Sequence, residues 1–176
     1  LKEDPVFCDY EVVLAAGDGI IASDDESAAA FDRVKDAIRD HDKTITLSVG
    51  QLTVGVTIPE WSGVLMLCNL QSASSYMQAA FRAQNPCAVT KNGCRLRKET
   101  AYVFDFDPAR TLIIFDAFAN NLSPRTADGG GTSDDRKENI RRLLNFFPVL
   151  GEDDEGRMVE LDAAQVLSIP RKLKSE

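Results

Sequence analysis

The chain has 176 residues, of which 44% are hydrophobic and 27% charged, and such values are typical of a soluble domain with a core of its own. A formal net charge of -8 and a sequence pI of about 4.7 argue against binding nucleic acid through overall positive charge, so any such contact has to be local. No apolar run approaches the ~18 residues of a membrane span and no signal-peptide pattern opens the chain, which predicts a cytoplasmic protein without membrane contact.

Strand and helix patterns alternate from residue 10 to residue 120. We predict strands at residues 10–16, 44–49, 63–68 and 100–106, and helices at 26–39, 72–83 and 108–120. The second and third strands are almost continuously apolar, as expected for strands covered on both faces. This order predicts the α/β class, with a mostly parallel sheet and helices on both faces. Residues 87–98 are expected to be a polar, basic connection.

The C-terminal third differs in composition. Residues 123–133 are rich in Gly, Ser, Thr, Pro and Asp, which predicts a flexible linker between a domain at 1–122 and a small helical appendage at 134–176. A helix to residue 147, capped by Ser133 or Asp134, and an edge strand at 157–161 are expected there. The helix carries four cations that either meet nucleic acid or form a solvated face balanced by acidic neighbours: Arg136, Lys137, Arg141 and Arg142.

Cysteine and histidine do not predict a metal site. The four cysteines form no CxxC pair, and the only histidine, His41, is far from them in sequence. We expect reduced thiols, with Cys68 buried at the end of a strand; a bridge or metal pair between Cys87 and Cys94 is the alternative.

The loop after the second strand has residues suited to phosphate. Gly50 and Gly55 permit close backbone approach, and the hydroxyls of Thr53 and Thr57 suit a phosphate or ribose oxygen. Its position after a strand is where α/β sheets present ligand sites. A plain connection between strands with glycine turns is the alternative.

The following helix places Gln78 and Arg82 four residues apart and therefore on one face. A guanidinium offers a fixed fork of donors that suits a triphosphate undergoing cleavage. The alternative is a surface helix on which Arg82 pairs with a carboxylate.

Four segments in this order resemble the second RecA-like domain of superfamily-two helicases and translocases: YEVVLAAGD, LTVGVTIPEW, YMQAAFRAQNP and ETAYVFDFDPAR. This group includes DEAD-box proteins and the motor subunits of restriction enzymes. LTVGVTIPEW resembles motif V, and YMQAAFRAQNP resembles motif VI in the glutamine-led form of restriction-type motors. The resemblance extends from about Tyr10 to Phe106.

The resemblance implies a role for each matching position. Gly55 matches the motif V glycine, and Thr57 stands where the family more often has an acidic residue or asparagine facing the nucleotide ribose. Gln78 matches the first position of motif VI and Arg82 the first of its two phosphate-facing arginines. The second arginine is replaced by Asn85, which departs from the pattern.

The implied function is that of a C-terminal motor domain in an ATP-dependent DNA helicase or translocase of a restriction-modification or defence system. Gln78 and Arg82 are then the catalytic residues, Gly55, Thr57 and Arg82 contact ATP, and Gly50 and Thr53 contact nucleic acid. DNA is the expected partner, although RNA is not excluded, and nuclease or methyltransferase modules are further partners.

The sequence contains no GKT or GKS and no acid pair on a strand, so ATP with Mg is expected to bind mainly to an upstream RecA-like domain of the same polypeptide. The fragment alone is then inactive. A non-catalytic regulatory module with the helicase-like fold is the alternative. Four acidic residues could belong to a metal-dependent nuclease site, and the alternative is that they lie at a strand edge and a helix cap: Glu99, Asp105, Asp107 and Asp116.

Overall fold

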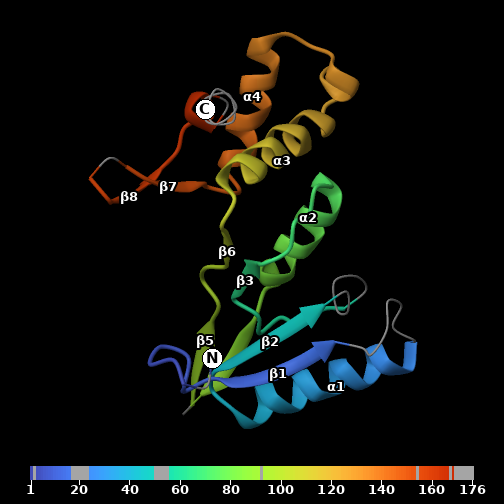
Figure 1. Ribbon diagram of the computed structural model, residues 1–176, viewed down its shortest axis with the longest axis vertical. Helices are drawn as coiled ribbons and strands as arrows, with labels where there is room; N and C mark the ends of the chain where they lie inside the picture. The colour runs from blue at the N-terminus through green and yellow to red at the C-terminus, as the bar shows by residue number, and fades with distance from the viewer. Residues whose placement is uncertain are drawn as a thin grey trace. The chain divides into compact units, whose positions relative to one another are not determined.

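The computed structural model describes residues 1, 3–16, 24–49, 56–91, 93–153, 155–166 and 168 (Figure 1). Its longer helices are α1 (Asp24–Asp40), α2 (Ala73–Ala80), α3 (Pro108–Asn121) and α4 (Ser133–Leu144), with 3₁₀ turns η1 (Phe81–Gln84) and η2 (Ala127–Gly129). Its strands are β1 (Glu11–Ala16), β2 (Thr44–Val49), β3 (Gly63–Met66), β4 (Ala88–Lys91), β5 (Cys94–Arg97), β6 (Tyr102–Asp105), β7 (Leu150–Glu152) and β8 (Met158–Glu160).

The described strands pair into two-stranded sheets, β1 with β2, β3 with β6, β4 with β5 and β7 with β8. The pair β1–β2 is parallel and is joined through α1, which forms the βαβ unit expected of the α/β class. The pairs β4–β5 and β7–β8 are antiparallel hairpins. Because the described strands do not join into one hydrogen-bonded sheet, the RecA-like arrangement stays a prediction.

The chain divides into two compact units. Unit 1 comprises Leu1–Val64 and Gln78–Val103, and unit 2 comprises Leu65–Met77 and Phe104–Glu176. The helix α3, which we assigned by sequence to the domain at 1–122, therefore groups with α4 in unit 2.

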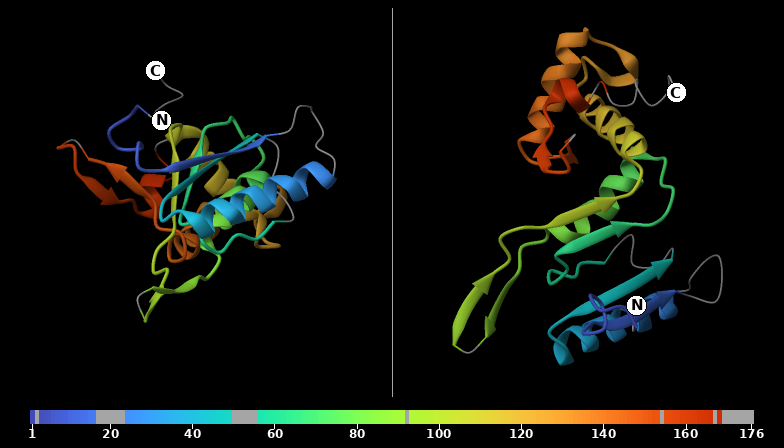
Figure 2. Two further views of the ribbon diagram at one scale, coloured as in Figure 1. Left: turned by 90° about the horizontal axis from the view of Figure 1, so that it is seen from below. Right: turned by 60° about the vertical axis from the view of Figure 1, so that its left-hand side comes forward.

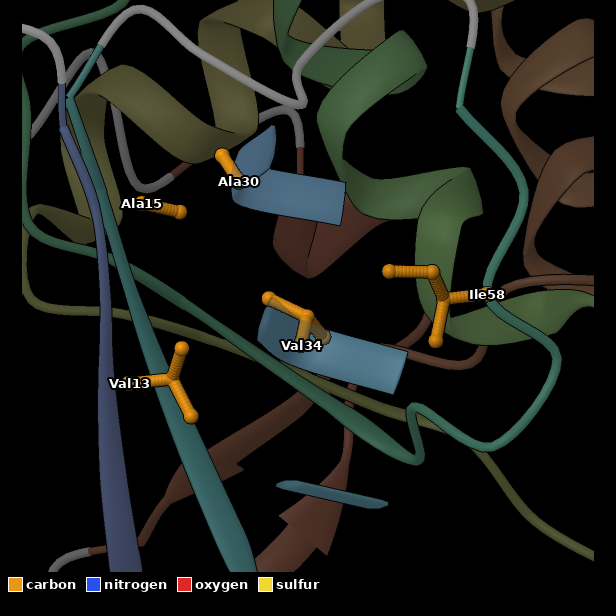
Figure 3. Close-up of a cluster of buried hydrophobic side chains, with 5 residues drawn as sticks. All are labelled: Val13, Ala15, Ala30, Val34 and Ile58. Atoms are coloured by element: carbon orange, nitrogen blue, oxygen red, sulfur yellow. The ribbon is translucent and has the colours of Figure 1, made fainter. Parts of the chain in front are cut away.

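The core of unit 1 forms between the βαβ unit and the segment that follows the predicted loop. Figure 3 shows its five buried side chains, Val13 and Ala15 from β1, Ala30 and Val34 from α1, and Ile58. Ala30 and Val34 are four residues apart and so share one face of α1. That face packs on β1, and Ile58 adds the segment after the loop to the same cluster.

Unit 2 is built on α3 and α4, whose buried side chains include Leu112, Phe115, Ile140, Leu143 and Leu144. The rings of Phe115 and Phe147 meet edge to face with centroids 5.9 Å apart. No helix in the described part of the chain is both long and apolar enough to span a membrane.

The segment predicted as a flexible linker lies inside unit 2 and contains a buried residue, Thr126. The Thr126 hydroxyl donates to the carbonyl of Asn120 at 2.8 Å and accepts from Nδ2 of Asn139 at 2.8 Å. These bonds join the end of α3 to α4. The α4 cap is Thr132, one residue before Ser133 and two before Asp134, the two predicted caps, and it forms a reciprocal capping box with Asp135.

Two local expectations were wrong. Cys68 is exposed, since β3 ends at Met66 and leaves Cys68 beyond the strand. β3 is not covered on both faces, because the side chain of Leu65 is 53% exposed. The predicted helix at 72–83 is confirmed, as α2 followed directly by the 3₁₀ turn η1.

Candidate functional site

The first part of the predicted ligand site cannot be placed. Gly50, Thr53 and Gly55 lie outside the described residues. The structure describes the end of that loop, Val56 to Ile58. Ile58 is fully buried in the core of unit 1 and Val56 packs against the same cluster, while Thr57 between them is exposed. The two apolar neighbours thus fix the backbone at Thr57 and leave its hydroxyl on the surface.

Arg82 reaches this loop end. Its Nη1 donates a hydrogen bond to the carbonyl of Val56, the residue before Thr57. Two positions that the sequence links only through the resemblance, 57 in motif V and 82 in motif VI, are therefore neighbours within unit 1. Gln78 is exposed on α2, in the part of that helix that belongs to unit 1.

The helix changes type between Gln78 and Arg82. An α-helix turns about 100° per residue and a 3₁₀ helix about 120°, so the switch after Ala80 rotates Arg82 away from Gln78 by roughly a further 40°. Gln78 is exposed, whereas Arg82 is half-buried. The two residues are therefore farther apart around the helix axis than an uninterrupted α-helix would place them.

Asn85 has a structural partner. Its Nδ2 donates to the carbonyl of Arg82 at 3.2 Å, and its backbone is extended with φ -60° and ψ 130°. Extended geometry is favoured before a proline such as Pro86. Asn85 thus closes η1, where the family pattern has a second arginine.

The residue that holds η1 to the loop, Lys98, was not predicted from the sequence. The ammonium of Lys98 donates to three main-chain carbonyls, those of Pro59, Trp61 and Ala83, at 2.7, 2.8 and 2.7 Å. Burial lowers the pKa of Lys98 below its ordinary value, against the opposing effect of nearby Cys87 and Glu60. Because Ala83 follows Arg82, Lys98 positions the backbone that carries the arginine. No local pattern marks a lysine for this role, since lysine is usually solvated.

The same loop is tied to α1. Oε1 of Glu60 accepts from Nζ of Lys35 at 2.9 Å. Burial by itself raises the pKa of Glu60, but the bond from Lys35 and its own backbone N–H bring it below the usual value. The segment from Val56 to Trp61 is thus held by a buried apolar anchor and by two lysines.

Three of the four carboxylates weighed as a nuclease site have structural partners. Asp107 caps α3 by accepting from the backbone N–H of Arg110 at 3.0 Å, and Asp105 pairs with the Arg110 guanidinium at 2.5 Å. Asp116 pairs with Arg136 at 3.0 Å. Within the described residues, no group of three or more His, Cys, Asp or Glu side chains is placed to hold a metal ion. These positions favour the strand-edge and helix-cap interpretation.

Tyr76, also in the segment that resembles motif VI, is a core residue of unit 2. Burial raises its pKa to about 12, and the nearby Asp105 carboxylate adds to this effect. The phenol is therefore neutral at physiological pH and is not placed for acid-base chemistry on the surface.

The positive charges of α4 are largely balanced. Arg136 pairs with Asp116, and Arg141 and Arg142 both pair with Glu138, at 2.5 and 3.2 Å. This arrangement favours the solvated-face interpretation over a nucleic-acid contact for these three arginines.

The chain is similar to a putative type II restriction enzyme and methyltransferase C-terminus of Mycoplasma pneumoniae, with 35% identity over 118 residues. The match covers 67% of this chain and 16% of the relative, so the chain spans less than a fifth of that protein. No protein-family model and no solved structure matches the chain. The sequence is thus related to a restriction-modification protein.

Proposed function

We propose that the chain is the C-terminal motor domain of an ATP-dependent DNA helicase or translocase within a restriction-modification protein. The relative supports the restriction-modification part of the proposal. The hydrogen bond from Arg82 to Val56 supports the motor part, because it brings the arginine of the segment that resembles motif VI to the residue before the exposed Thr57.

The donors at this place suit a nucleotide. A hydroxyl and a guanidinium both bond phosphate or ribose oxygens, and a guanidinium has five N–H donors that can serve more than one acceptor. They do not suit Mg²⁺, which prefers carboxylate and other oxygen ligands. Under the proposal, magnesium and most of the ATP are held by an upstream RecA-like domain of the same polypeptide.

In that arrangement Arg82 stabilises the negative charge that develops on the transferring phosphoryl group. Its bond to Val56 limits the freedom of the guanidinium and orients it at low entropic cost. Thr57 bonds the nucleotide from the adjoining loop end, and the exposed Gln78 faces the interdomain cleft and links nucleotide state to its closure.

The test is DNA-stimulated ATP hydrolysis by the proposed parent polypeptide. Arg82→Ala is expected to lower the rate on the order of a hundredfold or more, the scale of losing a positioned cation in phosphoryl transfer. Arg39→Ala is the matched control, since Arg39 is an exposed arginine paired with Asp36 and Asp40 on α1. The 176-residue chain alone is expected to hydrolyse no ATP. An unchanged rate with Arg82→Ala rejects the arginine assignment.

A non-catalytic regulatory module is the second candidate, and one observation favours it. The residue at the second arginine position, Asn85, is engaged in closing η1 and carries no charge for a phosphate. This candidate predicts a parent protein without DNA-stimulated ATPase activity, which the wild-type measurement decides.

A further inference from the structure

The hairpin β4–β5 is a basic two-stranded ribbon that the sequence analysis treated as a connection. Its antiparallel register pairs Ala88 with Arg97, Val89 with Leu96, Thr90 with Arg95 and Lys91 with Cys94. Figure 2 shows the two strands side by side in both views.

Alternation along the strands divides these side chains between two faces. Arg95 and Arg97 share one face, where the residues opposite them are Thr90 and Ala88. We call these four residues the arginine face; all four are exposed. Because alanine and threonine are short, nothing across the strand pair covers the two guanidinium groups. The other face carries the cross-strand apolar pair Val89 and Leu96, which stabilises the ribbon.

The segment that contains the hairpin is positively charged, whereas the chain as a whole is acidic. Residues 87–98 contain four Lys or Arg and no Asp or Glu, within a chain of net charge -8. Among the described residues, no carboxylate forms an ion pair with Arg95 or Arg97, in contrast to the balanced arginines of α4. An exposed positive patch without acidic neighbours favours a polyanionic partner.

We propose that the arginine face binds the sugar-phosphate backbone of DNA. Arg95 and Arg97 lie two residues apart on β5, so their Cα atoms are about 6.8 Å apart along the strand. A regular row of guanidinium forks suits a regular row of phosphates. The inference rests on the DNA partner of the proposed function and deepens it by naming the contact surface. The relative's name, a restriction enzyme and methyltransferase, favours DNA over an acidic protein.

The test is binding of the 176-residue chain to a fluorescein-labelled oligonucleotide, single-stranded and duplex, followed by anisotropy without nucleotide. Arg95→Ala with Arg97→Ala is expected to weaken binding by about tenfold or more near 0.1 M salt. Between about 50 and about 200 mM salt, the slope of log K against log salt should fall by roughly 1.4 for single strands and 1.8 for duplex, the loss of two phosphate contacts.

The matched control is Arg39→Ala with Arg157→Ala, which removes the same charge from two exposed, ion-paired arginines. It should leave the affinity and the slope close to wild type. Arg95→Lys with Arg97→Lys should keep the slope, because the positive charges are retained although the guanidinium groups are lost. Thermal unfolding by circular dichroism confirms that each variant is folded.

Three outcomes overturn the proposal: no DNA binding by the wild-type chain, equal losses in the hairpin and control variants, or DNA binding by the hairpin variant that equals that of the wild type. Because no ATP is present, failure here leaves the Arg82 test intact. Conversely, a null result with Arg82→Ala leaves the hairpin result standing.

Discussion

Replacing Lys98 by methionine tests how the candidate site is held together. Methionine keeps most of the unbranched side chain and removes the three hydrogen bonds to the carbonyls of Pro59, Trp61 and Ala83. Each charge-assisted hydrogen bond contributes about 1.5–3 kcal/mol when isolated. The three share one ammonium, whose burial already costs free energy, so they do not add. We therefore expect a loss of about 2–4 kcal/mol.

Urea unfolding measured by fluorescence suits this variant, because Trp61 is the only tryptophan and its carbonyl accepts from Lys98. A chain of this size shifts its midpoint temperature by about 2–4 °C per kcal/mol, so a thermal scan should show a fall of roughly 4–16 °C. Lys137→Met on α4 is the control, since this exposed lysine should change stability by less than about 0.5 kcal/mol.

If Lys98→Met costs no more than Lys137→Met, the three bonds do not hold the loop to η1. The assignment of Lys98 as a positioning residue is then wrong. In the parent polypeptide the same variant should reduce ATP hydrolysis through misplacement of Arg82, and Lys98→Arg should recover part of the stability.

Three further predictions concern unit 2 and are measured by urea unfolding with circular dichroism. Asp105→Asn should lower the free energy of unfolding by about 3 kcal/mol at neutral pH. It leaves the guanidinium of Arg110, whose side chain is only 15% exposed, without its carboxylate partner. Burial by itself raises the pKa of Asp105, but the bonds from the Asp107 N–H and from Arg110 bring it below the ordinary value of 3.8. The stability contributed by this ion pair is therefore present above pH 3.8 and is lost as pH falls through the folded-state pKa. Gly131→Ala should cost about 1–3 kcal/mol, since φ is +76° and the new Cβ falls 2.6 Å from Cγ2 of Thr126. Thr132→Ala should cost about 1 kcal/mol through loss of the capping box.

Each of these has its own control. A pH-independent gap between wild type and Asp105→Asn would contradict the ion-pair argument. Gly63→Ala should be nearly neutral, because its Cβ has no neighbour closer than 4.0 Å; equal costs for the two glycines would contradict the strain argument. Thr132→Ser should retain most of the cap, and a loss equal to that of alanine would show that the hydroxyl bond is not the cause.

Local signals that the sequence carries were enough for several elements. The period of α1, the apolar run of β2 and the Asp107-Pro108 start of α3 each predicted an element within a few residues of its observed bounds. The β4–β5 hairpin was missed although its signal is present, since Asn92-Gly93 between two short strands is a strong two-residue turn pattern. Its basic composition favoured a connection instead.

Sequence by itself determined which residues form the βαβ unit and which positions resemble motor motifs, because periodicity and order along the chain are local properties. Only the tertiary structure decided that Arg82 meets the carbonyl of Val56 and that Lys98 joins three carbonyls distant in sequence. It also decided that Thr126 is buried between α3 and α4. Such contacts depend on which backbone groups are left unpaired after the elements pack, and that is fixed only when residues far apart in the chain come together.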